Sequence, residues 1–129
     1  MEASPLAARN LALVTGASAG IGAAFARALA ARGNDVALVA RRLDRLEALA
    51  AELKQAHGVE ALPIQADLSV VDAHEAIMSA LSAHGRTIDT LVNNAGISIT
   101  QTFASTAWDN QRDFIMTLVT AVAGLTHAV

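Results

Sequence analysis

Cysteine is absent from the 129-residue sequence. Its absence excludes disulfide bonds, thiolate chemistry and cysteine-rich metal sites, and it fits a reducing compartment. The four histidines, at positions 57, 74, 84 and 127, show no spacing typical of paired metal ligands. We therefore expect them at the surface or at helix ends, and we expect no metal site.

A strong excess of one charge is also missing. Nine basic and twelve acidic residues are mixed along the chain and give a net charge of −3, so no basic face indicates a nucleic-acid partner. No apolar run approaches the roughly twenty residues of a membrane span, and residues 1–10 lack the apolar stretch and cleavage site of a signal peptide. We expect a cytoplasmic protein without a membrane partner.

Apolar residues, in contrast, are plentiful. They make up 53% of the chain, which is enough to build the core of a single domain over residues 1–129. Short apolar runs that suit buried strands alternate with stretches in which apolar residues recur at helical spacing. The expected strands are residues 11–14, 36–40, 59–65 and 88–93. Such an alternation predicts an α/β fold with a doubly wound parallel sheet, whose ligand crevice lies at the carboxyl ends of the strands.

The expected helices follow the strands in turn. The first covers the alanine-rich run 23–31 and the second covers residues 43–57. The third and fourth have the S/T-x-x-D form of a capped helix start, at Ser69 with Asp72 and at Thr106 with Asp109. An apolar stripe then runs to the chain end, formed by Trp108, Ile115, Leu118, Val122 and Leu125. We expect Trp108 in the core or as a lid over a cofactor.

The stretch TGASAGIG, Thr15–Gly22, joins the first strand to the first helix. Glycines permit positive φ and close approach of another group, and the free N–H groups and dipole of a helix start favour phosphate. The G-x-x-x-G-x-G spacing differs from the commonest dinucleotide fingerprint, and the lysine of a Walker loop is missing. A pyrophosphate site and a glycine turn without a ligand are the two interpretations.

Noteworthy residues also follow the other three strands. Arg41 and Arg42 occur where an NAD site would hold a carboxylate, so they favour the 2′-phosphate of NADP unless they are only the solvated start of a helix. Asp67-Leu68 fits either the adenine amino group and ring or a helix cap. The segment Asn93–Gly96, NNAG, has small residues that allow a ribose close to the backbone, and alone it would be a turn.

Together, TGASAGIG, Asp67-Leu68 and NNAG resemble the short-chain dehydrogenase/reductase family over essentially the whole chain. The resemblance implies a Rossmann-like fold, with Thr15 and Asn93 bracing strands one and four. It also implies an NADP-preferring cofactor site. In that site Gly16, Ser18, Ala19, Gly20, Ile21 and Gly22 would hold pyrophosphate and ribose, Arg41 and Arg42 would select NADP, Asp67 and Leu68 would bracket adenine, and Asn94, Ala95 and Gly96 would lie along the cofactor.

The departures from the family concern catalysis. The family protonates its substrate through a tyrosine assisted by a lysine and a serine, but this chain has no tyrosine and only one lysine, Lys54, in the second helix. Leu118 stands where the family places a helix-four asparagine, and the family's chains are about twice this length. We therefore expect the N-terminal half of an NADP-dependent oxidoreductase of carbonyls or alcohols, ending after four strand–helix units and inactive alone. An NADP-binding pseudoenzyme and a remnant without function are the alternatives.

The same resemblance bears on self-association. In the resembled fold the fourth strand pairs with a fifth, and the fourth helix packs into a subunit interface. A chain that ends after helix four leaves one strand edge and one apolar helix face free, and such surfaces favour association. We expect a homo-oligomer formed through helix four, or aggregation, unless another chain supplies the missing half.

Overall fold

The computed structural model describes residues 9–129; most of the residues on which the signal-peptide argument rests lie outside this range. Four parallel strands form one sheet in the order β3-β2-β1-β4. Their bounds are β1 Leu11–Thr15, β2 Asp35–Ala40, β3 Ala61–Gln65 and β4 Thr90–Val92. The chain moves outward from β1 to β3 and then returns to place β4 on the other side of β1. This reversal creates the crevice at which doubly wound sheets bind ligands.

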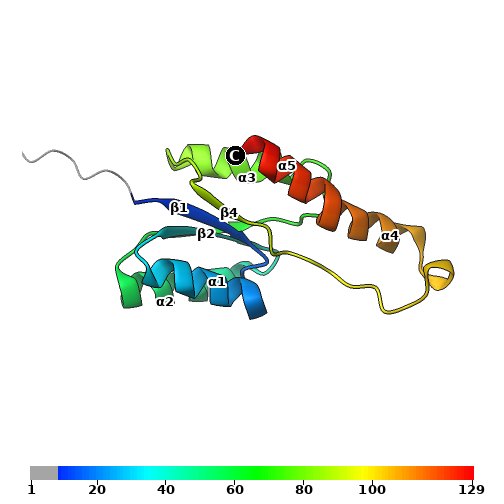
Figure 1. Ribbon diagram of the computed structural model, residues 1–129, viewed down its shortest axis with the longest axis horizontal. Helices are drawn as coiled ribbons and strands as arrows, with labels where there is room; N and C mark the ends of the chain where they lie inside the picture. The colour runs from blue at the N-terminus through cyan, green and yellow to red at the C-terminus, as the bar shows by residue number, and fades with distance from the viewer. Residues whose placement is uncertain (1–8) are drawn as a thin grey trace, which may run out of the picture.

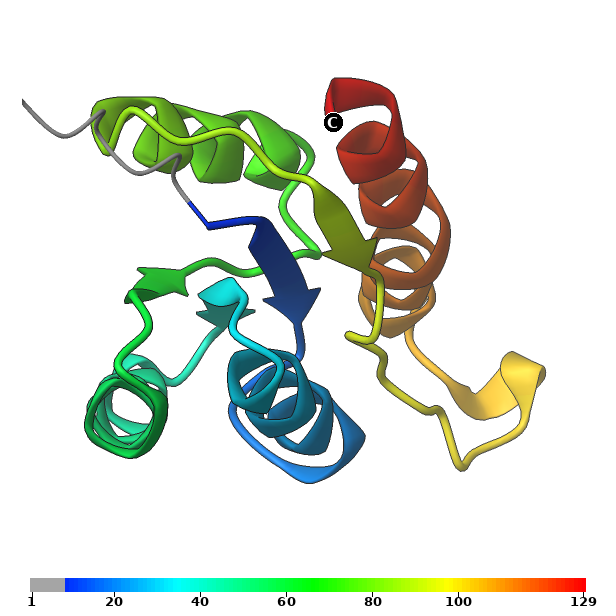
Figure 2. The same cartoon turned by 60° about the vertical axis from the view of Figure 1, so that its left-hand side comes forward.

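Helices cover both faces of the sheet, so the predicted fold class is confirmed (Figure 1). One layer holds α1 (Gly20–Ala31) and α2 (Leu43–His57). The other holds α3 (Ala73–Ala83) and a last helical stretch composed of α4 (Trp108–Ile115), the π-helix η2 (Met116–Thr120) and α5 (Ala121–Ala128). Figure 2 shows the strands between these layers. A 3-10 turn, η1 (Phe103–Ser105), precedes α4.

The alternation of side chains along β1 explains the two layers. Ala12 and Val14 face α1 and α2 and belong to one buried cluster, whereas Leu11 and Leu13 belong to a second cluster with α3 and α5. Successive side chains of a strand point to opposite faces. Because β1 is covered on both sides, all five of its residues are buried. Residues 11–14 are therefore apolar, and the hydroxyl of Thr15 at the end of the strand has hydrogen-bond partners.

Two expected helix starts are wrong. Helix α3 begins after Asp72 without a side-chain cap, because both the hydroxyl and the N–H of Ser69 bond to Asp67. Helix α4 follows Ala107, also without a side-chain cap. The hydroxyl of Thr106 donates instead to the carbonyl of Thr102 at 2.9 Å.

Three further expectations need correction. The third strand begins at Ala61 and not at residue 59, and the fourth covers residues 90–92 and not 88–93. Trp108 is neither core nor part of the cleft lining, because 63% of its surface is exposed. The apolar stripe of the last helix is therefore buried only toward its end, where Leu125 packs against α3.

Candidate functional site

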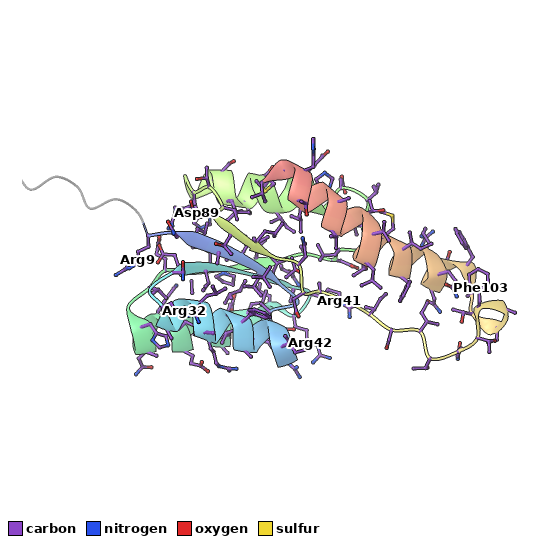
Figure 3. All side chains as sticks on the ribbon, viewed as in Figure 1. Arg9, Arg32, Arg41, Arg42, Asp89 and Phe103 are labelled. Carbon is purple, nitrogen blue, oxygen red and sulfur yellow. The ribbon has the colours of Figure 1, made fainter. Side chains whose placement is uncertain are left out.

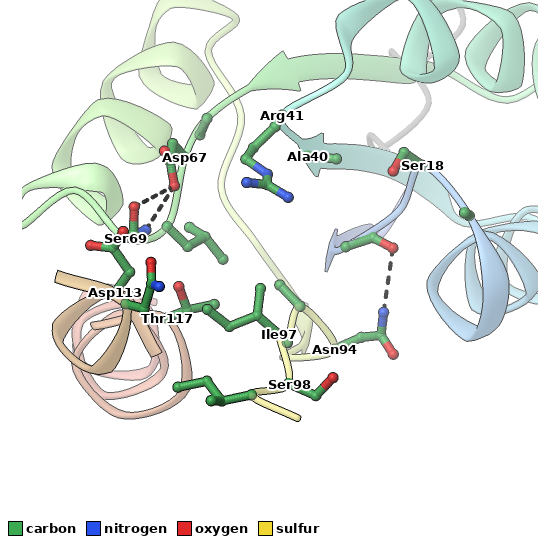
Figure 4. Close-up of a pocket in the computed structure, with 18 of the residues that line it drawn as sticks. Ser18, Ala40, Arg41, Asp67, Ser69, Asn94, Ile97, Ser98, Asp113 and Thr117 are labelled. Atoms are coloured by element: carbon green, nitrogen blue, oxygen red, sulfur yellow. Dashed lines mark hydrogen bonds between the residues drawn. The ribbon is translucent and has the colours of Figure 1, made fainter. Parts of the chain in front are cut away.

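A cleft of about 980 Å³ opens at the carboxyl ends of the strands. This volume is at the upper end of the range typical of ligand pockets. Ten of the thirteen predicted site residues line it: Gly16, Ser18, Ala19, Arg41, Arg42, Asp67, Leu68, Asn94, Ala95 and Gly96. The other three, Gly20, Ile21 and Gly22, form the first turn of α1 and do not line the cleft. Figure 4 shows how side chains from several elements converge on this space.

In the glycine turn, the backbone of Gly22 lies directly against the carbonyl group of Gly16. A Cβ atom added at Gly22 would lie 2.1 Å from the carbonyl oxygen of Gly16, so only glycine lets α1 begin here. Gly16 has φ of 64° and lies against the backbone of Ala95. Gly22 therefore shapes the turn from inside, while Gly16, Ser18 and Ala19 face the cleft.

A buried hydroxyl ties this turn to the end of β4. The Oγ1 atom of Thr15 accepts hydrogen bonds from the N–H groups of Asn94 at 3.0 Å and Ala95 at 2.9 Å. The Nδ2 atom of Asn94 donates to the carbonyl of Thr15 at 3.1 Å. The expected brace thus involves Thr15 and Asn94. Asn93 was the wrong residue, because its amide points to Thr126 on the last helix.

The two arginines after β2 both line the cleft and are exposed to solvent. Among residues 9–129 neither forms an ion pair, so both guanidiniums remain available to an anionic ligand. Figure 3 shows Arg41 and Arg42 toward one end of the sheet and Arg9 and Arg32 toward the other. Helix α2 begins directly after Arg42, so the position of the pair is compatible both with a solvated helix start and with the expected binding of an anion.

Asp67 is fixed by a short local turn. Its Oδ1 atom accepts hydrogen bonds from the Ser69 hydroxyl at 2.7 Å and from the Ser69 N–H at 3.0 Å. These bonds, with a smaller contribution from the charge of Arg41, hold the pKa of the Asp67 carboxyl below its ordinary value. The carboxylate is thus an ionised acceptor at the edge of the cleft. Leu68 beside it is buried.

The cleft also contains residues that the sequence did not identify as a group. The segment after NNAG contributes residues 97–101, including Ser98. The helical stretch contributes Asn110, Asp113 and Thr117. Their spacing of three and four residues places them on one helix face, and that polar periodicity was the signal available in the sequence.

Leu118 lies near the same region. Its Cδ2 atom would be 3.4 Å from a Cβ added at Gly96, so an apolar side chain packs over the NNAG turn.

None of the helices in residues 9–129 is long and apolar enough to cross a membrane.

The family model for short chain dehydrogenases matches residues 10–129. The chain belongs to the short-chain dehydrogenase family. An uncharacterized oxidoreductase of Myxococcus xanthus is 41% identical over 118 residues, which are 92% of this chain and 46% of the relative. Serine 3-dehydrogenase of Agrobacterium fabrum is 41% identical over 117 residues, which are 89% of this chain and 45% of the relative.

Solved short-chain dehydrogenase structures superpose closely on this fold. A short-chain dehydrogenase from Sphingobium yanoikuyae in complex with NADPH has a TM-score of 0.85 and 39% identity, covering 93% of this chain and 46% of its own. L-sorbose reductase from Gluconobacter frateurii, complexed with NADPH and L-sorbose, has a TM-score of 0.88 and 32% identity, covering 95% and 46%. The chain spans about half the length of these relatives.

Proposed function

We propose that these residues form the NADP(H)-binding part of an oxidoreductase that transfers hydride between the nicotinamide and a carbonyl or alcohol. One observation carries the proposal: the glycine turn, the arginine pair and Asp67 line a single cleft at the strand ends. NADPH supplies the hydride when bound. The chain's own residues bind and orient it: Gly16, Ser18 and Ala19, in the turn before α1, face the phosphates, and Asp67 accepts from the adenine amino group.

The arginine pair supports a preference for NADP over NAD. Guanidinium groups form charge-assisted, often bidentate bonds with phosphate, whereas an NAD site needs a carboxylate for the ribose hydroxyls. Asp35 does not supply that carboxylate, because it starts β2 at the opposite end of the strand and is bonded there to Arg86. Ser18 lines the same cleft and adds a hydroxyl donor.

The test is a comparison of NADPH and NADH affinities by calorimetry. In the double variant Arg41→Ala/Arg42→Ala we expect the NADPH affinity to fall by about tenfold or more, since hydrogen bonds between charged groups are lost. The NADH affinity should change little. Arg32→Ala is the matched control, because Arg32 is exposed near the other end of α1. Equal affinities of the wild type for both nucleotides would contradict the proposed preference.

We further propose that a polypeptide of these 129 residues alone binds NADPH without turnover. Reduction of a carbonyl requires a positioned proton donor for the developing alkoxide, and the sequence has no tyrosine to serve as one. Oxidation of NADPH by any carbonyl above a heat-killed control would refute this. The intact mass of the protein from its own cells, compared with 13.3 kDa, tests the alternatives: about twice that mass favours a catalytic half, and 13.3 kDa favours a binding protein or remnant.

A further inference from the structure

A polar stripe on the last helical stretch faces the cleft and has no role in the function proposed above. It is formed by Asn110 and Asp113 of α4 and by Thr117 of the π-helix. Thr117 is only 7% exposed, and no hydrogen bond joins its hydroxyl to another residue in the range 9–129. In this range every side-chain oxygen that is fully buried has a hydrogen-bond partner. Because the Thr117 hydroxyl has none, it must be accessible from the cleft that Thr117 lines. A polar group in this position is satisfied by a ligand or by water.

Asp67 lies on the same side of the cleft with one oxygen still free. Both hydrogen bonds from Ser69 go to Oδ1, and no residue in the described range bonds to Oδ2. Figure 4 shows Asp113 and Thr117 on the side of the cleft where Asp67 and Ser69 lie, with Asn94 and Ser18 on the other side. Two carboxylates and a hydroxyl thus border this part of the cleft.

We infer that Asp113 is a specificity-determining residue that reads the 6-position of the cofactor's base. The inference rests on the proposed NADP(H) site. An exocyclic amino group carries two N–H donors, so one can bond to the free Oδ2 of Asp67 and the other to Asp113. A 6-oxo group is an acceptor and would be repelled by both carboxylates. The pair therefore selects adenine over hypoxanthine.

The chemistry of the base makes this a strict test, because the two ligands differ only along one edge of the base. Hypoxanthine has an oxygen in place of the 6-amino group and a proton on the neighbouring N1, which in adenine is a bare acceptor. Nicotinamide hypoxanthine dinucleotide phosphate carries the same phosphates, riboses and nicotinamide as NADP. The ratio of its dissociation constant to that of NADP therefore isolates the contribution of this edge of the base, and the Asp113 variants identify the part that depends on Asp113. A site with buried or fixed polar groups discriminates strongly against a ligand that leaves them unpaired.

The experiment measures this ratio by calorimetry for the full-length wild type and for Asp113→Asn. We expect the wild type to prefer NADP by about tenfold or more, and the variant ratio to fall by about tenfold, because an amide can turn its NH2 group toward a 6-oxo group. Asp113→Ala removes the acceptor without adding a donor. Its ratio should fall less than that of Asp113→Asn, mainly through weaker NADP binding.

Asp109→Asn is the matched control. Asp109 lies on the same helix and makes the same kind of contact with Arg112, at 3.5 Å compared with 3.6 Å for Asp113, but it does not line the cleft. Its ratio should equal that of the wild type. An unchanged ratio in Asp113→Asn, or an equal change in Asp109→Asn, overturns the inference while leaving the NADP(H) site intact. A wild type that binds neither nucleotide overturns the NADP(H) site and the inference together.

Discussion

Replacing Arg86 with methionine should lower the free energy of unfolding more than the loss of an exposed ion pair does. The guanidinium of Arg86 donates to Oδ2 of Asp35 at 3.0 Å and to the carbonyl of Arg9 at 2.8 Å, and it also contacts Glu60. These partners stand at or just before the starts of β2, β1 and β3 respectively. Arg86 thus joins the amino ends of three strands.

The burial of the partners sets the magnitude. The side chain of Asp35 is 4% exposed and that of Arg86 is 13% exposed. Removing one member of a buried pair leaves an uncompensated charge and costs about 3–5 kcal/mol. Asp35 keeps a hydrogen bond from the Glu60 N–H at 2.8 Å and a distant contact with the half-exposed Arg9, so we expect the lower end of this range. That is a large share of the roughly 5–15 kcal/mol by which domains are stable.

The assay is urea unfolding followed by circular dichroism. Arg27→Met is the control, because Arg27 and Glu52 form an ion pair at 2.8 Å with both side chains about half exposed. Water screens such a pair, so its loss should change the unfolding midpoint little. Adding Asp35→Asn to Arg86→Met should recover part of the lost stability. Equal losses in the two arginine variants, or no recovery in the double variant, would refute the reasoning.

Three further outcomes are expected. Gly22→Ala should lose about 1–3 kcal/mol in urea unfolding, because the new Cβ would meet the carbonyl of Gly16; an unchanged midpoint would contradict this. Folding lowers the pKa of Asp67 from its ordinary value of 3.8, so the ionised carboxylate stabilises the folded protein above that pH. This stabilisation is lost as the pH falls through the lowered pKa. The stability of Asp67→Asn should therefore decrease less steeply in acid, as measured by unfolding at a series of pH values. The double variant Ile115→Ser/Val119→Ser replaces two apolar side chains of the last helical stretch that are 45% and 60% exposed. It should reduce self-association in size-exclusion chromatography, and a monomeric wild type would contradict the expected homo-oligomer.

The sheet was predictable because its signal is local and strong. Residues 36–39 are apolar at every position, which is typical of a strand covered on both faces, and the short length of the run favours a strand over a buried helix. The glycine turn was predictable for the same reason, since its spacing and its flanking elements appear within one short stretch. The placement of Arg41 and Asp67 on one cleft follows from the parallel topology, which brings the carboxyl ends of all strands to one edge.

The errors concern choices between competing partners. A serine three residues before an aspartate can cap a helix, but Ser69 bonds instead to the aspartate two residues before it, and local patterns do not rank these options. The bond between Asn94 and Thr15 joins residues 79 positions apart, so the sequence could not distinguish Asn94 from its neighbour Asn93. Trp108 has the spacing of a buried residue, yet nothing in the described chain covers it.

The charged side chains at the two ends of the sheet differ in whether they are paired within the protein. At the amino ends Asp35 and Arg86 form an ion pair and are mostly buried. At the carboxyl ends Arg41 and Arg42 are exposed, and neither forms an ion pair with any residue from 9 to 129. Charges that bind each other contribute to stability, and charges without partners are free for a ligand. Arg86→Met should therefore shift the unfolding midpoint while leaving the NADPH dissociation constant of the folded protein unchanged. The Arg41/Arg42 double variant should do the reverse, and a variant at either end that changes both quantities equally would show that the ends are coupled.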